Sequence, residues 1–154
     1  MKVSESLILE NIVPELQAKD KTEVLKELTR VVTSNSPVLS FDKTFETLQE
    51  RENLCSTAMD EGVAIPHGKL HGISKTVLAF GRSSKGIDFD SLDNKPTTIF
   101  ILILSPENSP KTHIQALAKI SNIFKTSEFR DNILKSDTAE EILELITGQD
   151  ESKE

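Results

Sequence analysis

The sequence predicts an α/β fold in which a mixed β-sheet is sandwiched between helical layers. Two observations lead to this prediction. Segments with helical and strand-like patterns follow one another in the order strand, two helices, three strands, three helices. In addition, the run TTIFILILS at residues 97–105 is apolar at almost every position, so both of its faces must be covered, as in a central strand with helices above and below.

The N-terminal segment predicts a strand followed by an amphipathic helix. Residues 6–13, SLILENIV, form the predicted strand. Residues 19–34 predict the helix, with Asp20 as its N-cap and Glu23 in the capping-box position. Its apolar residues recur at helical spacing: Val24, Leu25, Leu28, Val31 and Val32. This helix is therefore expected to bury one face.

The next segment predicts a second helix and then three strands. Residues 41–53 have Phe45 and Leu48 on one side, with Asp42 as a candidate cap, and this helix carries Arg51 near its end. Three β-rich apolar runs bounded by Gly, Pro, Asn and Ser follow, at residues 63–67, 76–83 and 97–105.

A long helix is predicted within residues 105–124, where the helical period returns. Pro110 suits its first turn, and His113 falls in that turn as well. The expected buried stripe consists of Ile114, Leu117, Ala118, Ser121 and Phe124.

The C-terminal segment predicts two more helices, at residues 126–136 and 136–148, with Gly148 ending the last one. The polar, charged sequence beyond it is typical of a loose chain end. We therefore expect a single domain over residues 1–148 and a frayed tail over residues 149–154.

Composition argues against several classes of function. A formal net charge of -7 disfavours a general attraction to nucleic acid or to anionic lipid. The apolar runs are too short for a signal peptide or a membrane span, so neither is expected. Cys55 is the only cysteine, which excludes an internal disulfide and fits a reducing compartment. We therefore expect a cytoplasmic protein that binds no nucleic acid and inserts into no membrane.

Three histidines are candidate reactive residues. His67 follows the apolar run 63–66 and precedes a glycine, so its ring is expected at a strand end. From these residues alone, a reactive and a structural histidine are equally compatible with the pattern. His113 lies near a helix N-terminus, where N–H groups favour an anion, although a hydrogen-bonded surface histidine also fits there. His71 matches no sequence motif that we can name.

The histidine spacing does not favour a metal site, and none is expected. His67 and His71 lie four residues apart, but the neighbouring proline and glycines disfavour the helix that would align them as ligands. A lone cysteine such as Cys55 is more often a small packed residue than a nucleophile. The usual motifs of serine hydrolases, P-loop nucleotide hydrolases and dinucleotide-binding enzymes are absent from the sequence.

The segment RENLCSTAMDEGVAIPHGK, residues 51–69, resembles the signature of enzyme IIA of the phosphoenolpyruvate-dependent sugar phosphotransferase system, fructose/mannitol type. That family includes the nitrogen-regulatory IIA proteins. Its signature begins with an arginine, continues with Ser-Thr and closes with Gly-x-Ala-Ile-Pro-His-Gly. The resemblance covers nearly the whole chain, and it also implies a mixed sheet between helical layers.

The resemblance implies a phosphoryl-transfer site with assigned roles. His67 would accept the phosphoryl group, His113 would lie beside it, and Arg51 would face the phosphate. Ser56 and Thr57 match the Ser-Thr of the signature, so they are expected to offer hydroxyl donors to the same pocket. A neutral imidazole supplies the lone pair that such a nucleophile needs, and a guanidinium binds two phosphate oxygens at once.

Two functions are compatible with the resemblance. In the first, the protein is a phosphotransferase subunit that takes phosphate from the histidine-containing phosphocarrier protein and passes it to a IIB component for sugar uptake. In the second, it is a nitrogen-regulatory protein whose phosphorylation state controls binding to transporters, kinases or regulators. No cofactor is expected in either case. Docking partners are expected to use an apolar rim with Met59, Val63 and Ile65 as candidates.

Overall fold

A computed structural model describes residues 1–152, and its centre is one five-stranded mixed sheet. The strand order is β1–β4–β5–β2, and β3 also pairs with β5. β1 is parallel to β4, β4 is antiparallel to β5, and both β2 and β3 are parallel to β5. The strands are β1 (Leu7–Val13), β2 (Val63–Ala64), β3 (His67–Leu70), β4 (Val77–Ile87) and β5 (Thr97–Pro106).

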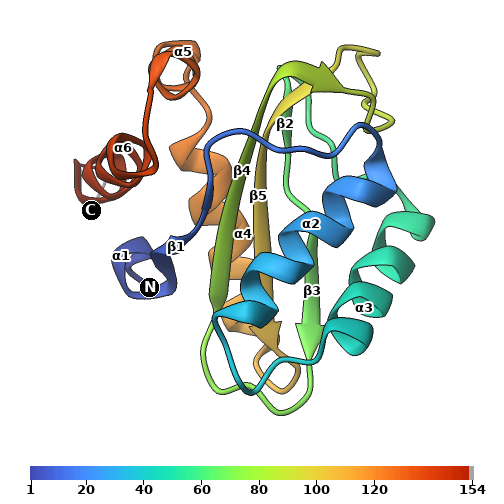
Figure 1. Cartoon of the computed structure of the whole chain (residues 1–154). Coiled ribbons are helices and arrows are strands. Elements are labelled where there is room, and N and C mark those ends of the chain that lie inside the picture. The colour runs from blue at the N-terminus through green and yellow to red at the C-terminus, as the bar shows by residue number, and fades with distance from the viewer. Residues whose placement is uncertain (153–154) are drawn as a thin grey trace.

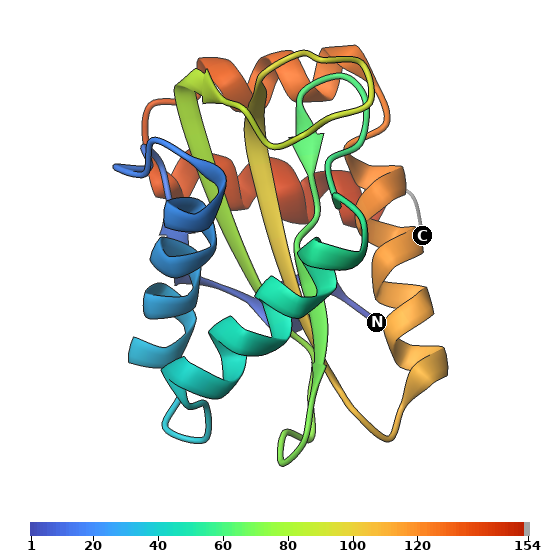
Figure 2. The same cartoon turned by 90° about the vertical axis from the view of Figure 1, so that its right-hand side faces the viewer.

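Helices cover both faces of this sheet, which confirms the predicted sandwich (Figure 1). One face carries α2 (Lys21–Ser34) and α3 (Phe41–Leu54). The other face carries α4 (Pro110–Ile123), α6 (Ala139–Ser152) and the two shorter helices α1 (Val3–Ser6) and α5 (Ser127–Lys135). Figure 2 shows α3 crossing in front of the strands with α2 at their left, α6 passing behind them and α4 at the right.

The central strand β5 supplies both hydrophobic cores, as its uniformly apolar sequence predicts. Ile99, Ile101 and Ile103 belong to the core beneath α4, α5 and α6. The intervening residues point the other way, because side chains alternate along a strand. Phe100 and Leu104 accordingly belong to the core beneath α2 and α3.

The buried face of α4 differs from the predicted stripe. Ile114 is 66% exposed, whereas the buried residues of this helix are His113, Ala116, Ile120 and Ile123. The predicted stripe was therefore wrong at Ile114 and Ala118, which are exposed, and right at Phe124, which is buried. Apolar residues lie on more than one side of α4, so their spacing alone does not determine which side of the helix faces the core. In the structure, the buried side of α4 includes His113.

The predicted end of the last helix is also wrong. α6 continues through Gly148 to Ser152, and its residue Asp150 is buried. One oxygen of Asp150 accepts a hydrogen bond from the Val3 N–H at 2.8 Å, and the other lies 3.1 Å from Lys119 Nζ. These contacts explain why residues 149–152 continue the helix where a frayed tail was expected. Residues 153–154 of that predicted tail lie outside the described residues.

The remaining differences from the predicted elements are local. Ser40 caps α3 by accepting from the Lys43 N–H at 3.4 Å, so the expected cap at Asp42 is wrong. The short helix α1 was not predicted at all. The predicted cap of α2 is confirmed, because the Asp20 carboxylate accepts from the Glu23 N–H at 2.9 Å.

Candidate functional site

His67 is the first residue of strand β3, whereas the sequence predicted it at the end of a strand. The predicted strand 63–67 is split into β2 and β3, with Ile65 and Pro66 between them. Proline has no N–H for the strand ladder, so pairing is interrupted there. It resumes at His67, which lies opposite Ile103 of β5. The register with β5 is the same before and after this interruption.

A hydrogen bond to Ile65 determines which nitrogen of His67 carries hydrogen. His67 Nδ1 lies 2.7 Å from the Ile65 carbonyl oxygen. A carbonyl oxygen only accepts hydrogen bonds, so Nδ1 must be the donor. In the neutral ring, the lone pair then belongs to Nε2. Burial lowers the pKa of His67, and Arg51 and Lys69 lower it further, while the Ile65 hydrogen bond and the charge of Glu52 act in the opposite direction.

His113 lies beside His67, as expected. The two ring centroids are 5.3 Å apart, and the ring planes are inclined by 50°. His113 is only 5% exposed, and its Nδ1 lies 2.7 Å from Ser105 Oγ at the end of β5. Burial is the main reason that its pKa falls to about 4, and the positive charges of Lys69 and Arg51, together with the neighbouring His67, contribute. Both rings are therefore neutral near pH 7.

Arg51 reaches the same place from the last turn of α3. Its Nη1 donates to the Cys55 carbonyl oxygen at 2.8 Å, which ties the guanidinium to the end of its own helix. A Cβ atom at Gly68 would lie 2.8 Å from Thr47 Cγ2, so any larger residue would force a shift where α3 crosses β3. This close approach brings the arginine to the histidine pair.

Arg51, His67 and His113 line one open cavity of about 590 Å³. Its other lining residues are Thr47, Glu50, Leu54, Gly68, Lys69 and Leu117. Leu54 is 82% exposed, and the neighbouring Ile114 is also exposed. The cavity therefore presents two neutral imidazoles and a guanidinium at a surface edged with apolar side chains.

The apolar rim differs from the predicted one. Val63 and Ile65 are both buried in the core, so they cannot touch a partner. Met59 is partly exposed but is not among the residues that line the cavity. Leu54 and Leu117 form the rim instead. Helical spacing was the available signal, because Leu54 follows Arg51 by three residues and Leu117 follows His113 by four.

Ser56 and Thr57 do not join the cavity that Arg51 and the histidines share. Ser56 Oγ donates to the Phe89 carbonyl oxygen at 2.6 Å. The Thr57 hydroxyl donates to the buried carboxylate of Glu52. Both hydroxyls are thus used within the protein, and the structure does not place them where the resemblance implies. Cys55, next to them, is exposed.

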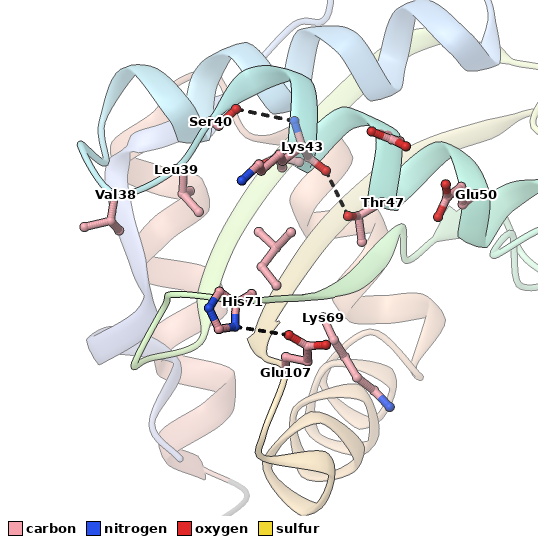
Figure 3. A pocket seen from close by; sticks show the side chains of 12 residues that line it. Val38, Leu39, Ser40, Lys43, Thr47, Glu50, Lys69, His71 and Glu107 are labelled. Atoms are coloured by element: carbon pink, nitrogen blue, oxygen red, sulfur yellow. Dashed lines mark hydrogen bonds and ion pairs between the residues drawn. The ribbon is translucent and has the colours of Figure 1, made fainter.

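A second cavity, of about 430 Å³, lies along the same helix and strand (Figure 3). His71 belongs to this second cavity, where its Nδ1 lies 3.4 Å from Glu107 Oε2. The two cavities share Thr47, Glu50 and Lys69 as lining residues. His71 lines only the second cavity, whereas His67 and His113 line only the first. Within residues 1–152, no group of three His, Cys, Asp or Glu side chains is arranged to hold a metal ion.

The fold and the first cavity define a class of protein, namely a small α/β domain that presents an uncharged histidine, backed by a second histidine and an arginine, at an open surface. Residues 5–149 match the family model described as phosphoenolpyruvate-dependent sugar phosphotransferase system, EIIA 2. The chain belongs to this family, and it is a phosphocarrier of the phosphotransferase-system type.

Similar proteins come from both branches of the family. The chain is 31% identical to the PTS system fructose-specific EIIABC component of Bacillus subtilis, over 97% of this chain but only 24% of that protein's length. The crystal structure of nitrogen regulatory protein IIA-Ntr from Neisseria meningitidis superposes with a TM-score of 0.87 at 32% identity, covering 94% of this chain and 99% of that one.

A second similar structure is a complex. Enzyme IIA mannitol of Escherichia coli, solved with phosphorylated enzyme IIB mannitol, superposes with a TM-score of 0.75. Its identity is 21%, over 90% of this chain and 95% of that one, so this likeness shows the fold alone. Among the described residues, no helix has the length and apolar character needed to cross a membrane.

Proposed function

We propose that His67 accepts a phosphoryl group from the histidine-containing phosphocarrier protein and passes it to a IIB component, for uptake of a sugar. One observation carries this proposal. The Ile65 carbonyl holds the hydrogen on Nδ1 of His67 and leaves Nε2 as the nitrogen with a lone pair, in a cavity open to a protein partner. In this role the protein needs no cofactor, because its donor and acceptor are phosphorylated side chains of other proteins. The proposal places the protein in the cytoplasm.

The transfer step follows from that arrangement. The Nε2 lone pair attacks the phosphorus atom, and the bond from phosphorus to the donor's histidine nitrogen breaks. The bonding electrons return to the donor's nitrogen. Nδ1 keeps its hydrogen and its bond to the Ile65 carbonyl throughout, so the positive charge gained by the ring faces a carbonyl dipole.

Arg51 and His113 would stabilise the charge that spreads over the phosphoryl oxygens in the transition state. A guanidinium has five N–H donors, so the bond from Arg51 to the Cys55 carbonyl leaves others to bind phosphate. If the Ser105 hydroxyl donates to Nδ1 of His113, then Nε2 of that ring carries hydrogen and donates to the phosphate. Ser105 would thus select the donor form of His113.

The second candidate is a nitrogen-regulatory role, in which phosphorylation of the same His67 controls binding to transporters, kinases or regulators. The similarity to IIA-Ntr from Neisseria meningitidis supports this candidate. The chemistry at His67 would be the same in both cases. Only the sugar-uptake role requires onward transfer to a sugar-specific IIB component.

The test is incubation with phosphoenolpyruvate, enzyme I and the histidine-containing phosphocarrier protein, followed by intact-mass measurement at neutral pH. We expect the wild type and His71→Gln to gain one acid-labile phosphate, and His67→Gln to gain none. A phosphate on His67→Gln would contradict the assignment of His67. Adding a IIB component and its sugar then separates the two roles, because only the first yields sugar phosphate.

Arg51→Lys tests the phosphate-binding role of the guanidinium in the same assay. The charge remains but the planar, two-pronged donor is lost, so we expect acceptance to slow by roughly tenfold or more. Equal rates would remove Arg51 from the proposed site.

A further inference from the structure

A chain of four hydrogen bonds links the ring of His67 to a buried carboxylate. Ile65 lies at its centre, because its carbonyl accepts from His67 Nδ1 at 2.7 Å and its N–H donates to the Thr57 carbonyl at 3.1 Å. The Thr57 N–H donates to Glu52 Oε1 at 2.9 Å, and the Thr57 hydroxyl donates to Glu52 Oε2. The carboxylate at the end of this chain belongs to the residue that directly follows Arg51.

The carboxylate of Glu52 is itself held in place. It is buried, and Lys21 Nζ of α2 lies 3.1 Å from its Oε1. The same ammonium lies 4.8 Å above the ring of Phe89, whose carbonyl accepts from Ser56. A buried carboxylate is tolerated only when it is paired and hydrogen-bonded, and Glu52 meets both conditions. Its position is therefore set by α2, by α3 and by the segment after β4.

The segment between α3 and β2 needs such an anchor, because little regular structure holds it. It is bonded to the sheet region at an isolated bridge between Ala58 and Ala64 and at Gly62, whose carbonyl accepts from the N–H groups of Thr98 and Ile99 at 2.9 and 3.1 Å. It then turns through Glu61 and Gly62, which both have positive φ. Thr57 is the point at which this segment is fastened to α3 on one side and to Ile65 on the other.

We propose that Thr57 and Glu52 are positioning residues for phosphoryl transfer: they hold the Ile65 carbonyl where it fixes the hydrogen on Nδ1 of His67 and directs Nε2 into the cavity. This inference rests on the proposed function of His67. It gives the Ser-Thr of the signature a role within the protein, behind the nucleophile, in place of direct contact with phosphate.

Thr57→Val tests the hydroxyl, because it removes the donor to Glu52 and retains a β-branched side chain of similar shape. In the wild type we expect the ring nitrogens of His67 to show one tautomer, with hydrogen on Nδ1, in long-range ¹H–¹⁵N spectra. In Thr57→Val we expect a mixture of tautomers. We expect its single-turnover rate of phosphate acceptance to fall roughly tenfold, with the apparent KM for the phosphorylated donor unchanged.

Thr29→Val is the matched control. Thr29 is also buried, and its hydroxyl donates to the Leu25 carbonyl at 2.5 Å within α2, outside the chain of bonds to His67. This change should leave both the His67 tautomer and the acceptance rate as in the wild type. Thr57→Ser keeps the donor and should restore both. A general loss of packing would affect the two valine variants alike, and that result would overturn the proposal.

Glu52→Gln separates charge from hydrogen bonding. The amide oxygen still accepts from the Thr57 N–H, and the amide NH2 can donate to the Thr57 hydroxyl oxygen, but the negative charge that raises the pKa of His67 is gone. We expect the NMR titration of His67 to move to lower pH, with the tautomer largely retained. A single Nδ1–H tautomer together with a wild-type rate in Thr57→Val would sink the inference. Because the tautomer is measured without any phosphoryl donor, that result is distinguishable from failure of His67 to accept phosphate.

Discussion

Two buried carboxylates in this protein serve different ends. Asp150 binds the Val3 N–H and Lys119, so α6 is joined to both α1 and α4; we call these three residues the terminal clasp. Glu52 is equally well paired, but its chain of hydrogen bonds ends at His67, whose Nε2 is left for a partner's phosphate. A paired, buried carboxylate thus holds helices together in one region and is linked to the proposed nucleophile in the other.

This difference predicts whether a substitution should alter stability or phosphoryl transfer. No residue of the terminal clasp lines the cavity, so its loss should affect folding alone. Changes near His67 should affect transfer, and they should affect stability only where packing or burial is altered. Four experiments probe this division, from the largest expected effect to the smallest.

Asp150→Ala tests the terminal clasp. It leaves the Val3 N–H and Lys119 without this carboxylate, so we expect the free energy of unfolding to fall by about 3 kcal/mol. Urea unfolding measures the loss. The rate of phosphate acceptance by the folded protein should equal that of the wild type. Glu144→Ala, an exposed change on the same helix, should alter neither quantity. Slower transfer in folded Asp150→Ala would break the proposed division.

His113→Gln tests the cost of keeping a neutral histidine buried. The folded state has a pKa of about 4 at His113, below the value of 6.5 for an unperturbed histidine. The unfolded chain therefore binds a proton first as the pH falls, and folding loses on the order of 2 kcal/mol between pH 7 and pH 4.5 from this group. His113→Gln should lack that part of the decline in urea unfolding, whereas exposed His71→Gln should retain it. Identical pH profiles for all three proteins would contradict the burial of His113 in its neutral form.

Gly68→Ala tests the crossing of α3 over β3. The added methyl group would meet Thr47, so we expect a loss of about 1–2 kcal/mol in unfolding free energy and slower transfer, because α3 carries Arg51. Gly148→Ala is the control, since nothing lies within 4 Å of its added Cβ and it lies inside α6. It should gain roughly 0.5–1 kcal/mol from helix propensity. A stability loss in Gly68→Ala without slower transfer would separate the crossing from the site.

Leu54→Ser tests the apolar rim. Leu54 is 82% exposed, so its replacement should leave the unfolding free energy within about 0.5 kcal/mol of the wild type. We expect the apparent KM for the phosphorylated donor to rise several-fold, because a partner loses an apolar contact. Leu92→Ser removes a leucine that is 90% exposed but does not line the cavity, and it should leave the KM unchanged. Equal KM values for both variants would place docking elsewhere.

The layered fold was predictable because burial leaves a periodic trace in the sequence. The run 97–105 is apolar on both faces, and β5 is covered on both. Where the apolar pattern fits more than one buried side of a helix, the prediction was wrong: α4 buries His113 and exposes Ile114. The extension of α6 was missed for another reason. It depends on the contact between Asp150 and Val3, which are 147 residues apart in sequence, and no local pattern contains that contact.

The site was predictable only as a set of residues. Arg51, His67 and His113 were chosen through resemblance to a family signature, and the structure places all three in one cavity. Their roles stay predictions. The local sequence could not show that the Ser56 hydroxyl turns away from the cavity, because its acceptor, the Phe89 carbonyl, is 33 residues away in sequence. The acceptor of the Thr57 hydroxyl, Glu52, is only five residues away, but a charged residue is not expected to be buried, and Glu52 is.

The hydrogen bond between His67 and Ile65 has a consequence for how partners would recognise the protein. The Ile65 carbonyl holds the imidazole in one orientation, and the proposed transfer leaves this bond intact. The loaded and empty forms would then share one shape and differ in charge, because the phosphoryl group brings roughly -1.5 to -2 units of charge and the ring gains one positive charge. A partner could tell them apart by electric field alone, and the ionic strength of the solution would set how sharply it does so.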